Sequence, residues 1–159
     1  MDAGDVKAFI NSWKLDVHVA ELAPESTKTS VLAAASLGCT VAEIAKSIAF
    51  GYVAGGKEKT VVAVLSGDKK VDTAKLKKLL GAESIHIMGP EEVKEKTGYA
   101  IGGVPPFPHK NGITVIADKS LLRFQYVWAA AGASNAVMKI KPALLSEKLR
   151  VPFEDISVA

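Results

Sequence analysis

One loop concentrates residues whose types suit a binding site built from main chain. Residues 98–110 contain the only place where glycine, proline and aromatic residues crowd together. Gly102 and Gly103 let the backbone bend sharply and let another molecule approach the main chain closely. Pro105 and Pro106 then fix φ and remove two N–H donors, so the following backbone is stiff. Residue types alone favour an ordinary structural loop, since glycine and proline punctuate loops generally, and a binding wall is the alternative.

Lys46 is the one charged residue in the apolar and small-residue stretch 45–50. A lysine in such a stretch either extends its ammonium group along apolar surface to solvent or points into a cavity that holds an anionic partner. The pattern by itself favours the solvent-directed conformation and leaves the cavity open as an alternative.

Other reactive side chains lack the partners that chemistry requires. Cys39 has no base nearby in the sequence, so we interpret it as a small buried residue. Asp118 follows a predicted strand and can act as a general base, but a capping carboxylate is the more common role. His18 has no neighbouring histidine or cysteine, so we expect a half-buried or surface histidine and not a ligand. With one cysteine and no nucleotide-binding or metal-protease motif, we expect no metal and no cofactor.

The composition is that of an ordinary globular domain with a mild positive charge. The chain has 159 residues and a net charge of +3, which fits a single domain over residues 1–159. Lysines cluster between residues 57 and 78, which suits either an RNA-tracking surface or a solvated face. The first residues lack a signal-peptide pattern and no apolar run reaches the length of a membrane span, so a cytoplasmic location without membrane contact is expected.

Hydrophobic periodicity predicts one α+β domain with a mixed, partly closed and barrel-like sheet flanked by helices. Predicted helices cover residues 4–14, a segment from 26 to 37, a short segment from Thr40 to Ile48, and residues 73–80, 91–96 and 142–149. Predicted strands cover residues 17–20, 48–54, 60–65, 84–88, 113–117, 126–130 and 136–140. The predicted cap of the first helix is Asp5, and that of the second is Ser26 or Thr27.

Three segments, taken in order along the chain, resemble one protein family. They are Ser-Thr-Lys-Thr at 26–29 with Ile-Ala-Lys-Ser-Ile at 44–48, the glycine–proline segment 97–107, and Ala-Ala-Gly-Ala-Ser-Asn at 130–135. Together they resemble the YbaK/EbsC family of free-standing trans-editing proteins, which are similar to the editing insertion domain of bacterial prolyl-tRNA synthetase. The resemblance covers nearly the whole chain and implies the YbaK-type fold.

The resemblance implies hydrolysis of the ester bond of mischarged aminoacyl-tRNA, typically alanine or cysteine on the proline tRNA. It implies that Lys46 holds the terminal phosphate or orients the substrate, and that Gly102 and Gly103 stabilise the carbonyl oxygen through backbone N–H groups. It implies no metal, cofactor or protein nucleophile, with a substrate hydroxyl or water taking part. The implied substrate-binding residues are Thr29, Val104, Pro105, Pro106, Phe107, His109, Gly132, Ser134 and Asn135. The implied partner is the acceptor end of aminoacyl-tRNA, and prolyl-tRNA synthetase and a second copy in a homodimer stay open.

The chain departs from the family pattern at the residues that bear on substrate choice. Pro105 stands where many members carry serine, and Asn135 stands where some carry aspartate or glycine. The amino acid removed and the tRNA identity therefore stay open. A tRNA-binding module without catalysis, and a hydrolase of small aminoacyl compounds, are the alternatives.

Overall fold

The computed structural model describes residues 1–109 and 112–159. The α-helices of this part of the chain are α1 (Ala3–Ser12), α2 (Ser30–Leu37), α3 (Thr73–Leu80), α4 (Pro90–Thr97) and α5 (Pro142–Glu147). Its strands are β1 (Val19–Glu21), β2 (Ile44–Ala54), β3 (Lys57–Ser66), β4 (Ser84–Ile87), β5 (Thr114–Asp118), β6 (Val127–Ala130), β7 (Ala136–Ile140) and β8 (Phe153–Glu154). Short 3₁₀ helices are η1 (Pro24–Thr27), η2 (Val41–Glu43) and η3 (Lys119–Arg123).

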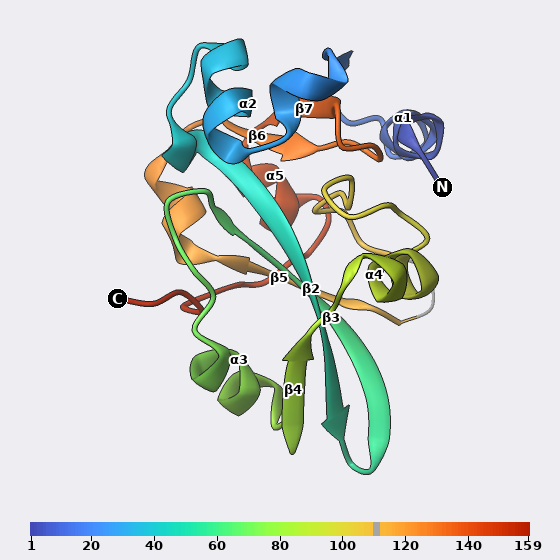
Figure 1. Cartoon of the computed structure of the whole chain (residues 1–159), viewed down its shortest axis with the longest axis vertical. Coiled ribbons are helices and arrows are strands. Elements are labelled where there is room, and N and C mark those ends of the chain that lie inside the picture. Colours follow the sequence, from blue (N-terminus) through green and yellow to red (C-terminus); the bar gives the residue numbers. More distant parts are fainter. Residues whose placement is uncertain (110–111) are drawn as a thin grey trace.

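The strands form one mixed sheet, as the sequence predicts. The order is β1-β7-β6-β2-β3-β5-β8, and β4 pairs separately with β2 (Figure 1). β2 and β3 are antiparallel, whereas β2 runs parallel to β6 and β3 runs parallel to β5. The α+β class is confirmed, but the sheet is not closed into the partly closed, barrel-like form that was predicted, because β1 and β8 form its two separate ends.

The β2–β3 hairpin is the longest pairing in the sheet. Gly55 and Gly56 form its turn, and both have positive φ (59° and 73°), which suits the two-residue turns whose twist matches that of the strands. Pairing runs from Ala54 opposite Lys57 to Ala45 opposite Ser66. The strands predicted at residues 48–54 and 60–65 are confirmed, and both begin earlier than predicted, at Ile44 and at Lys57.

The helix predicted from Thr40 to Ile48 is wrong beyond Glu43. Thr40 and Glu43 form the expected capping box, but it supports only the single 3₁₀ turn η2. The chain then enters β2 at Ile44, because pairing with β3 and β6 outweighs the helical spacing of the apolar residues. Lys46 therefore projects from a strand.

Two helix starts also differ from prediction. Asp2, not Asp5, caps α1: its carboxylate accepts from the Gly4 N–H, and Asp5 completes the capping box. Residues 24–27 form η1, so Thr29 caps α2 by accepting from the Leu32 N–H. This places the Thr29 side chain at the start of α2.

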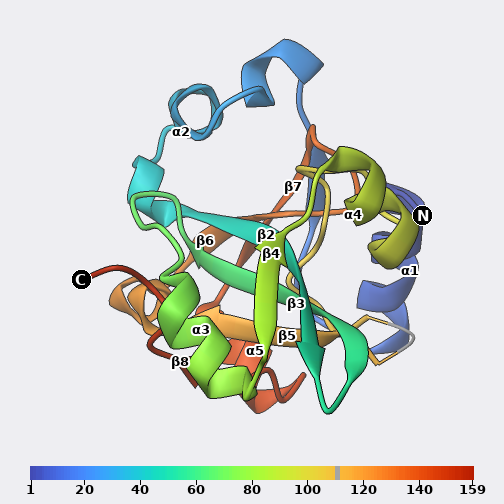
Figure 2. The same ribbon diagram turned by 60° about the horizontal axis from the view of Figure 1, so that its bottom comes forward.

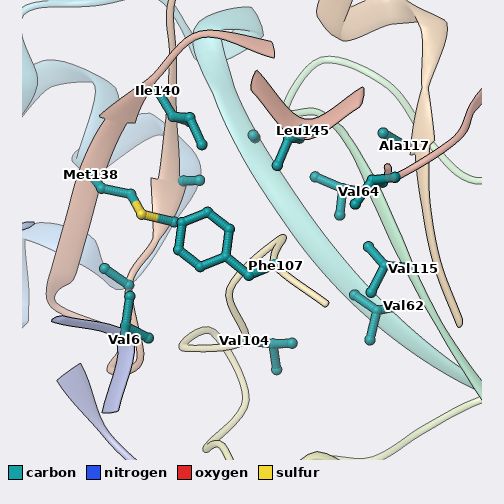
Figure 3. Packing of buried hydrophobic residues seen from close by; sticks show 14 of the residues in the cluster. Val6, Val62, Val64, Val104, Phe107, Val115, Ala117, Met138, Ile140 and Leu145 are labelled. Atoms are coloured by element: carbon teal, nitrogen blue, oxygen red, sulfur yellow. The ribbon is translucent and has the colours of Figure 1, made fainter. Parts of the chain in front are cut away.

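The core lies on both faces of the central strands. Residues 61–65 of β3 are completely buried, and residues 61–64 alternate between two hydrophobic clusters. The larger cluster joins α1, α5, β5, β6 and β7 to the glycine–proline loop, with Phe107 near Met138 (Figure 3). The smaller cluster packs Leu76 of α3 and Ile156 against Phe50. No helix in the described residues has the length and apolar character needed to cross a membrane.

Candidate active site

A cleft of about 220 Å³ lies where the three segments that carry the family resemblance meet. In Figure 2, η1 and α2 stand off the sheet as an arch above the starts of β2 and β6. The cleft beneath is lined by Thr27, Lys28, Thr29, Ser30, Ala33, Ile44, Ala45, Lys46, Ser47, Gly102, Val104, Trp128, Ala129, Ala130, Ser134 and Val137. The structure thus brings together five of the predicted site residues: Thr29, Lys46, Gly102, Val104 and Ser134.

One edge of β2 opens onto this cleft. On the side away from β3, β2 pairs with β6 only through Ala45 and with β4 only from Phe50 onward. On that same edge the Ala49 carbonyl accepts from the Met88 N–H. Because backbone groups of successive residues point to opposite edges, the N–H and C=O of Ser47 also point away from β3. The cleft therefore meets a stretch of strand edge that no strand of the described residues covers.

Lys46 is half-buried at the cleft wall. Its ammonium group lies 3.5 Å from the Gly67 carbonyl oxygen, a long contact for a charged donor. Burial lowers the pKa of Lys46; the nearby Asp68 carboxylate opposes this shift and Lys70 adds to it. The ammonium group is thus only weakly held, and it remains able to bind an incoming anion.

Hydroxyl groups supply most of the other polar atoms in the cleft. The Thr29 hydroxyl accepts from the Leu32 N–H at 3.1 Å and keeps its own proton to donate. The Ser47 hydroxyl is buried and has no hydrogen-bond partner among the described residues. Ser134 is exposed at the opposite wall. These groups can orient the ribose or the amino group of a ligand.

Gly102 and Gly103 play different structural parts. Gly102 adopts φ of +83°, and no acceptor for its N–H exists among the described residues. The Gly103 N–H, in contrast, already donates to the Ala100 carbonyl at 2.9 Å. The Gly103 carbonyl accepts from the Gly132 N–H, also at 2.9 Å. This hydrogen bond joins the glycine–proline loop to the loop at residues 131–135, which connects β6 and β7. Gly103 and Gly132 are buried and do not line the cleft.

Four further predicted residues lie outside the cleft. Pro105, Phe107 and His109 line a second cavity of about 710 Å³, which is bounded by α1 and α4. Phe107 is 2% exposed and stacks on Phe9, with ring centroids 4.9 Å apart, as part of the core. Pro106 is buried and is not part of the cleft wall.

His109 and Asn135 are both held by backbone carbonyls. The His109 Nε2 atom lies 3.2 Å from the Pro105 carbonyl oxygen, and the ring packs edge-on against Tyr99. Burial lowers the pKa of His109, and the contact with Pro105 opposes that shift only in part. The Asn135 amide donates to the Leu22 carbonyl at 2.9 Å, and this contact anchors the loop before β7 to the segment after β1. Neither side chain reaches the cleft in this structure.

Lys28, Ser47 and Trp128 line the cleft although sequence reasoning did not select them. Trp128 had a usable signal, because it alternates with apolar neighbours in a predicted strand and so faces away from the core. Val127 and Ala129 are buried, at 0% and 1% exposure, as that alternation requires.

The described lining residues of the cleft include no aspartate, glutamate, histidine or cysteine, so its only titratable side chains are those of Lys28 and Lys46. Asp118 is buried elsewhere and caps η3, with hydrogen bonds from the Ser120 and Ile156 N–H groups. Cys39 is partly exposed and not buried as predicted, and its thiol has a pKa raised by partial burial and, secondarily, by Glu43. No group of three or more histidine, cysteine, aspartate or glutamate residues in the described chain can hold a metal ion. Two lysines, hydroxyl groups and backbone amides are what the cleft offers.

Comparison with known proteins identifies relatives along the whole chain. The model of the aminoacyl-tRNA editing domain matches residues 24–147. The uncharacterized protein YwhH of Bacillus subtilis is 34% identical over 147 residues, covering 92% of this chain and 90% of YwhH. The multifunctional Ser/Thr-tRNA deacylase ProXp-y of Escherichia coli is 28% identical over 107 residues, covering 67% of this chain and 64% of that protein.

A solved structure shares the fold over almost its full length. It is a crystal structure described provisionally as a trans-editing enzyme for prolyl-tRNA synthetase. It superposes with a TM-score of 0.86 at 32% identity and covers 99% of this chain and 97% of its own. The chain belongs to the aminoacyl-tRNA editing family, the YbaK family that its sequence resembles, and is by that membership an aminoacyl-tRNA deacylase.

Proposed function

We propose that the cleft hydrolyses the ester bond of mischarged tRNA in trans, with alanine or cysteine on the proline tRNA as the substrate. The observation that carries this proposal is the meeting of Lys46, Thr29, Gly102 and Ser134 around one cleft of about 220 Å³. These residues come from segments that are far apart in the sequence, and they supply positive charge, hydroxyl groups and main-chain donors at one place.

The two lysines of the cleft suit the phosphate of the terminal adenosine. Lys46 and Lys28 both line the cleft, and no described carboxylate lines it to neutralise them. An ammonium group binds a phosphate as a point charge, which tolerates movement of the ligand. Lys46 would place the ester next to the loop that carries Gly102.

Backbone N–H groups would stabilise the developing negative charge on the ester carbonyl oxygen. The Gly102 N–H is the better candidate of the two adjacent glycines, because the Gly103 N–H is already bonded to Ala100. The open-edge amide of Ser47 is a second candidate. We assign Gly103 to positioning the loop that carries Gly102.

The nucleophile is proposed to be water, positioned with help from the free hydroxyl of the substrate ribose. The water oxygen attacks the carbonyl carbon, the tetrahedral intermediate collapses, and the bond between that carbon and the ribose oxygen breaks. The ribose oxygen takes up the proton that water gives up. The products are the free amino acid and a tRNA with a free 3′ end.

Small walls would select the amino acid by size. Ala45, Ala129 and Ala130 line the cleft, together with Val104. Such walls admit a small side chain and exclude a larger one sterically, which is how a second-site editing sieve works. Pro105 does not line the cleft, so we assign the choice of amino acid to these small residues.

A deacylation panel tests the proposal. Purified protein is incubated with proline tRNA charged with labelled alanine, cysteine, serine or proline, and loss of the ester is followed over time. We expect rapid loss of alanine or cysteine and retention of proline. If none of the mischarged tRNAs is hydrolysed faster than in buffer, the proposed function is wrong; tight binding without turnover would identify a tRNA-binding module instead.

The same panel tests the partner proposals. We propose prolyl-tRNA synthetase as the source of the mischarged tRNA. Adding the synthetase is expected to raise the deacylation rate if tRNA is handed over directly, and to leave it unchanged if tRNA is captured from solution. Light scattering at the assay concentration determines whether the active species is a homodimer.

A further inference from the structure

We infer that an aromatic–lysine strip along β6, β7 and the residues that flank them, formed by Tyr126, Trp128, Lys139 and Lys141, binds the single-stranded nucleotides that precede the terminal adenosine of the tRNA. The inference rests on the proposed function for the identity of the ligand. It concerns a surface outside the residues assigned above to the ester and the terminal phosphate, although Trp128 also lines the cleft.

The strip is built by strand alternation and register. Val127 and Ala129 are buried, so the intervening Trp128 side chain projects from the opposite face of β6. Trp128 pairs directly with Lys139 of β7. The two side chains therefore lie on the same face of the sheet, since directly paired residues share a face.

Each aromatic ring of the strip has a lysine ammonium group beside it. The Lys139 Nζ atom lies 4.8 Å from the centroid of the Tyr126 ring and 6.0 Å from that of the Trp128 ring. The Lys141 Nζ atom lies 5.5 Å from the Tyr126 centroid. Among the described residues, neither lysine forms an ion pair. The positive charges are therefore available to a ligand.

The strip continues directly into the cleft. Trp128 and Ala130 of β6 line the cleft together with Val137 of β7. From Ala130 back to Tyr126, the residue before β6, an extended backbone spans about 13 Å away from that wall. A chain whose last residue occupies the cleft would thus find the strip along its path.

Aromatic rings alternating with lysines match the chemistry of single-stranded RNA. Bases stack on aromatic side chains regardless of their identity, and lysines follow the phosphate backbone. The carboxylate of Glu43 lies near Lys139, but it is held by the Thr40 N–H at 3.0 Å and by the Thr40 hydroxyl at 2.9 Å. The favoured occupant is therefore RNA and not an acidic protein surface.

Tryptophan fluorescence gives a direct test, because the chain contains only Trp13 and Trp128. A Trp13→Phe variant leaves Trp128 as the sole reporter. This variant is titrated with a short single-stranded RNA that ends in CCA and carries no amino acid. Binding is followed independently by the fluorescence anisotropy of a labelled copy of the same RNA. We expect quenching of Trp128 emission that tracks RNA binding, and no quenching by inorganic polyphosphate.

Charge removal tests the lysines. Lys139→Gln/Lys141→Gln in the same background is expected to weaken RNA binding at least tenfold at low salt. It should also reduce the slope of log K against log salt by about 1.4, since each phosphate contact to a single strand contributes about 0.7. Lys77→Gln/Lys78→Gln on the exposed face of α3 removes the same charge elsewhere and is the matched control. It should leave both the affinity and the slope unchanged.

The outcomes separate this inference from the proposed function. The RNA-binding role of the strip is wrong if Trp128 fluorescence is not quenched when the protein is saturated with RNA. It is also wrong if the two double variants lose RNA affinity equally. If the Lys139→Gln/Lys141→Gln variant deacylates tRNA and binds RNA as the wild type does, the RNA-binding role of the strip is wrong and the proposed function stands. If RNA quenches Trp128 and the Lys139/Lys141 changes weaken RNA binding as expected, but no mischarged tRNA is deacylated, the RNA-binding role of the strip is supported and the proposed function is wrong.

Discussion

At the scale of single residues, Lys46 is where the needs of ligand binding and of stability oppose each other. Its ammonium group is half-buried, and the nearest acceptor is the Gly67 carbonyl at 3.5 Å. Burial lowers its pKa, so the folded protein disfavours the charge that phosphate binding requires. Such a conflict is expected of a residue retained for a ligand.

We predict that Lys46→Met lowers deacylation without lowering thermal stability. Loss of one charge-assisted hydrogen bond is worth about 1.5–3 kcal/mol, which corresponds to a rate decrease of roughly 10- to 150-fold. Single-turnover kinetics on alanyl-tRNA of the proline tRNA measure the rate, and circular dichroism measures Tm. Wild-type activity in the variant, or a clear drop in Tm, would remove Lys46 from its assigned role.

The same lysine should impose a pH dependence on stability. Because its pKa is lower in the folded protein than in the unfolded chain, the unfolded chain binds more protons between these two values. The contribution of Lys46 to the free energy of unfolding therefore rises as pH rises through that window. In urea titrations across alkaline pH, Lys46→Met should lack this rise, and parallel pH profiles for the two proteins would contradict the assignment.

Single residues were predictable where side-chain chemistry decides, and not where backbone hydrogen bonds decide. Lys46, Thr29 and Ser134 were selected from the residues that carry the family resemblance, and they lie around the cleft. Gly103 has an occupied N–H and Asn135 an occupied amide, and both partners come from the folded path of the main chain. The type of a residue does not indicate which backbone group it bonds to in the folded chain.

At the scale of elements, the loop between β6 and β7 packs backbone against backbone with both the glycine–proline loop and the start of α1. Gly132 has φ of +99°, and a Cβ atom there would clash with the backbone of Asp2, which caps α1. A Cβ atom on Gly103 would lie 2.9 Å from Ala133 Cα. Glycine is therefore needed at both positions for close approach, and Gly102 is held in place through these contacts.

We predict that Gly132→Ala destabilises the protein by about 2–4 kcal/mol, since it adds a steric clash to an unfavourable φ. Gly38→Ala is the control, because Gly38 also has positive φ (69°) but its added Cβ meets nothing within 4 Å. The control should cost only about 1 kcal/mol. Urea denaturation compares the two, and equal losses would show that the contact with α1 is unimportant.

Asp118 links β5 to η3 and to the C-terminal segment. Burial acts to raise its pKa, but the hydrogen bonds from Ser120 and Ile156 outweigh burial and hold the pKa below its usual value. We predict that Asp118→Asn costs about 1–3 kcal/mol at neutral pH, because one buried N–H loses its acceptor.

The sign of the pH effect follows from the lowered pKa of Asp118. The stabilisation is complete above the ordinary aspartate pKa of about 3.9 and is lost as pH falls through the folded value. The difference in free energy of unfolding between the two proteins should therefore shrink in acid. A difference that stays constant down to the lowest measurable pH would contradict the proposed hydrogen bonding.

Elements were predictable where periodicity is unambiguous. The continuous apolar run at 61–65 predicts a buried strand, and β3 is one. Residues 40–48 have apolar positions at helical spacing, yet residues 45–48 pair with β3 and Ile44 pairs with β6, which makes residues 44–48 part of β2. Such pairing lies outside any local window, so this element could not be assigned from its own residues.

At the scale of the whole molecule, the site exists only because the sheet gathers segments that are distant in sequence. Thr29, Lys46, Gly102 and Ser134 span more than a hundred positions and meet at one cleft. The α+β class follows from the order of elements, but their assembly around a cleft could be anticipated only through the family resemblance. A larger cavity lies on the other side of the glycine–proline loop, between α1 and α4. We therefore propose that the smaller cleft, and not the larger cavity, receives the aminoacyl end.

Amide chemical-shift mapping distinguishes the cleft from the larger cavity as the binding site. The ligand is adenosine carrying alanine through a 3′ amide in place of the ester, which cannot be hydrolysed by ester cleavage. We predict the largest shifts at the amides of Ser47, Gly102 and Ser134, with the amides of Phe9 and Trp13 in the larger cavity unmoved. Largest shifts at Phe9 and Trp13, with Ser47 and Gly102 unchanged, would show that the aminoacyl end binds in the larger cavity instead.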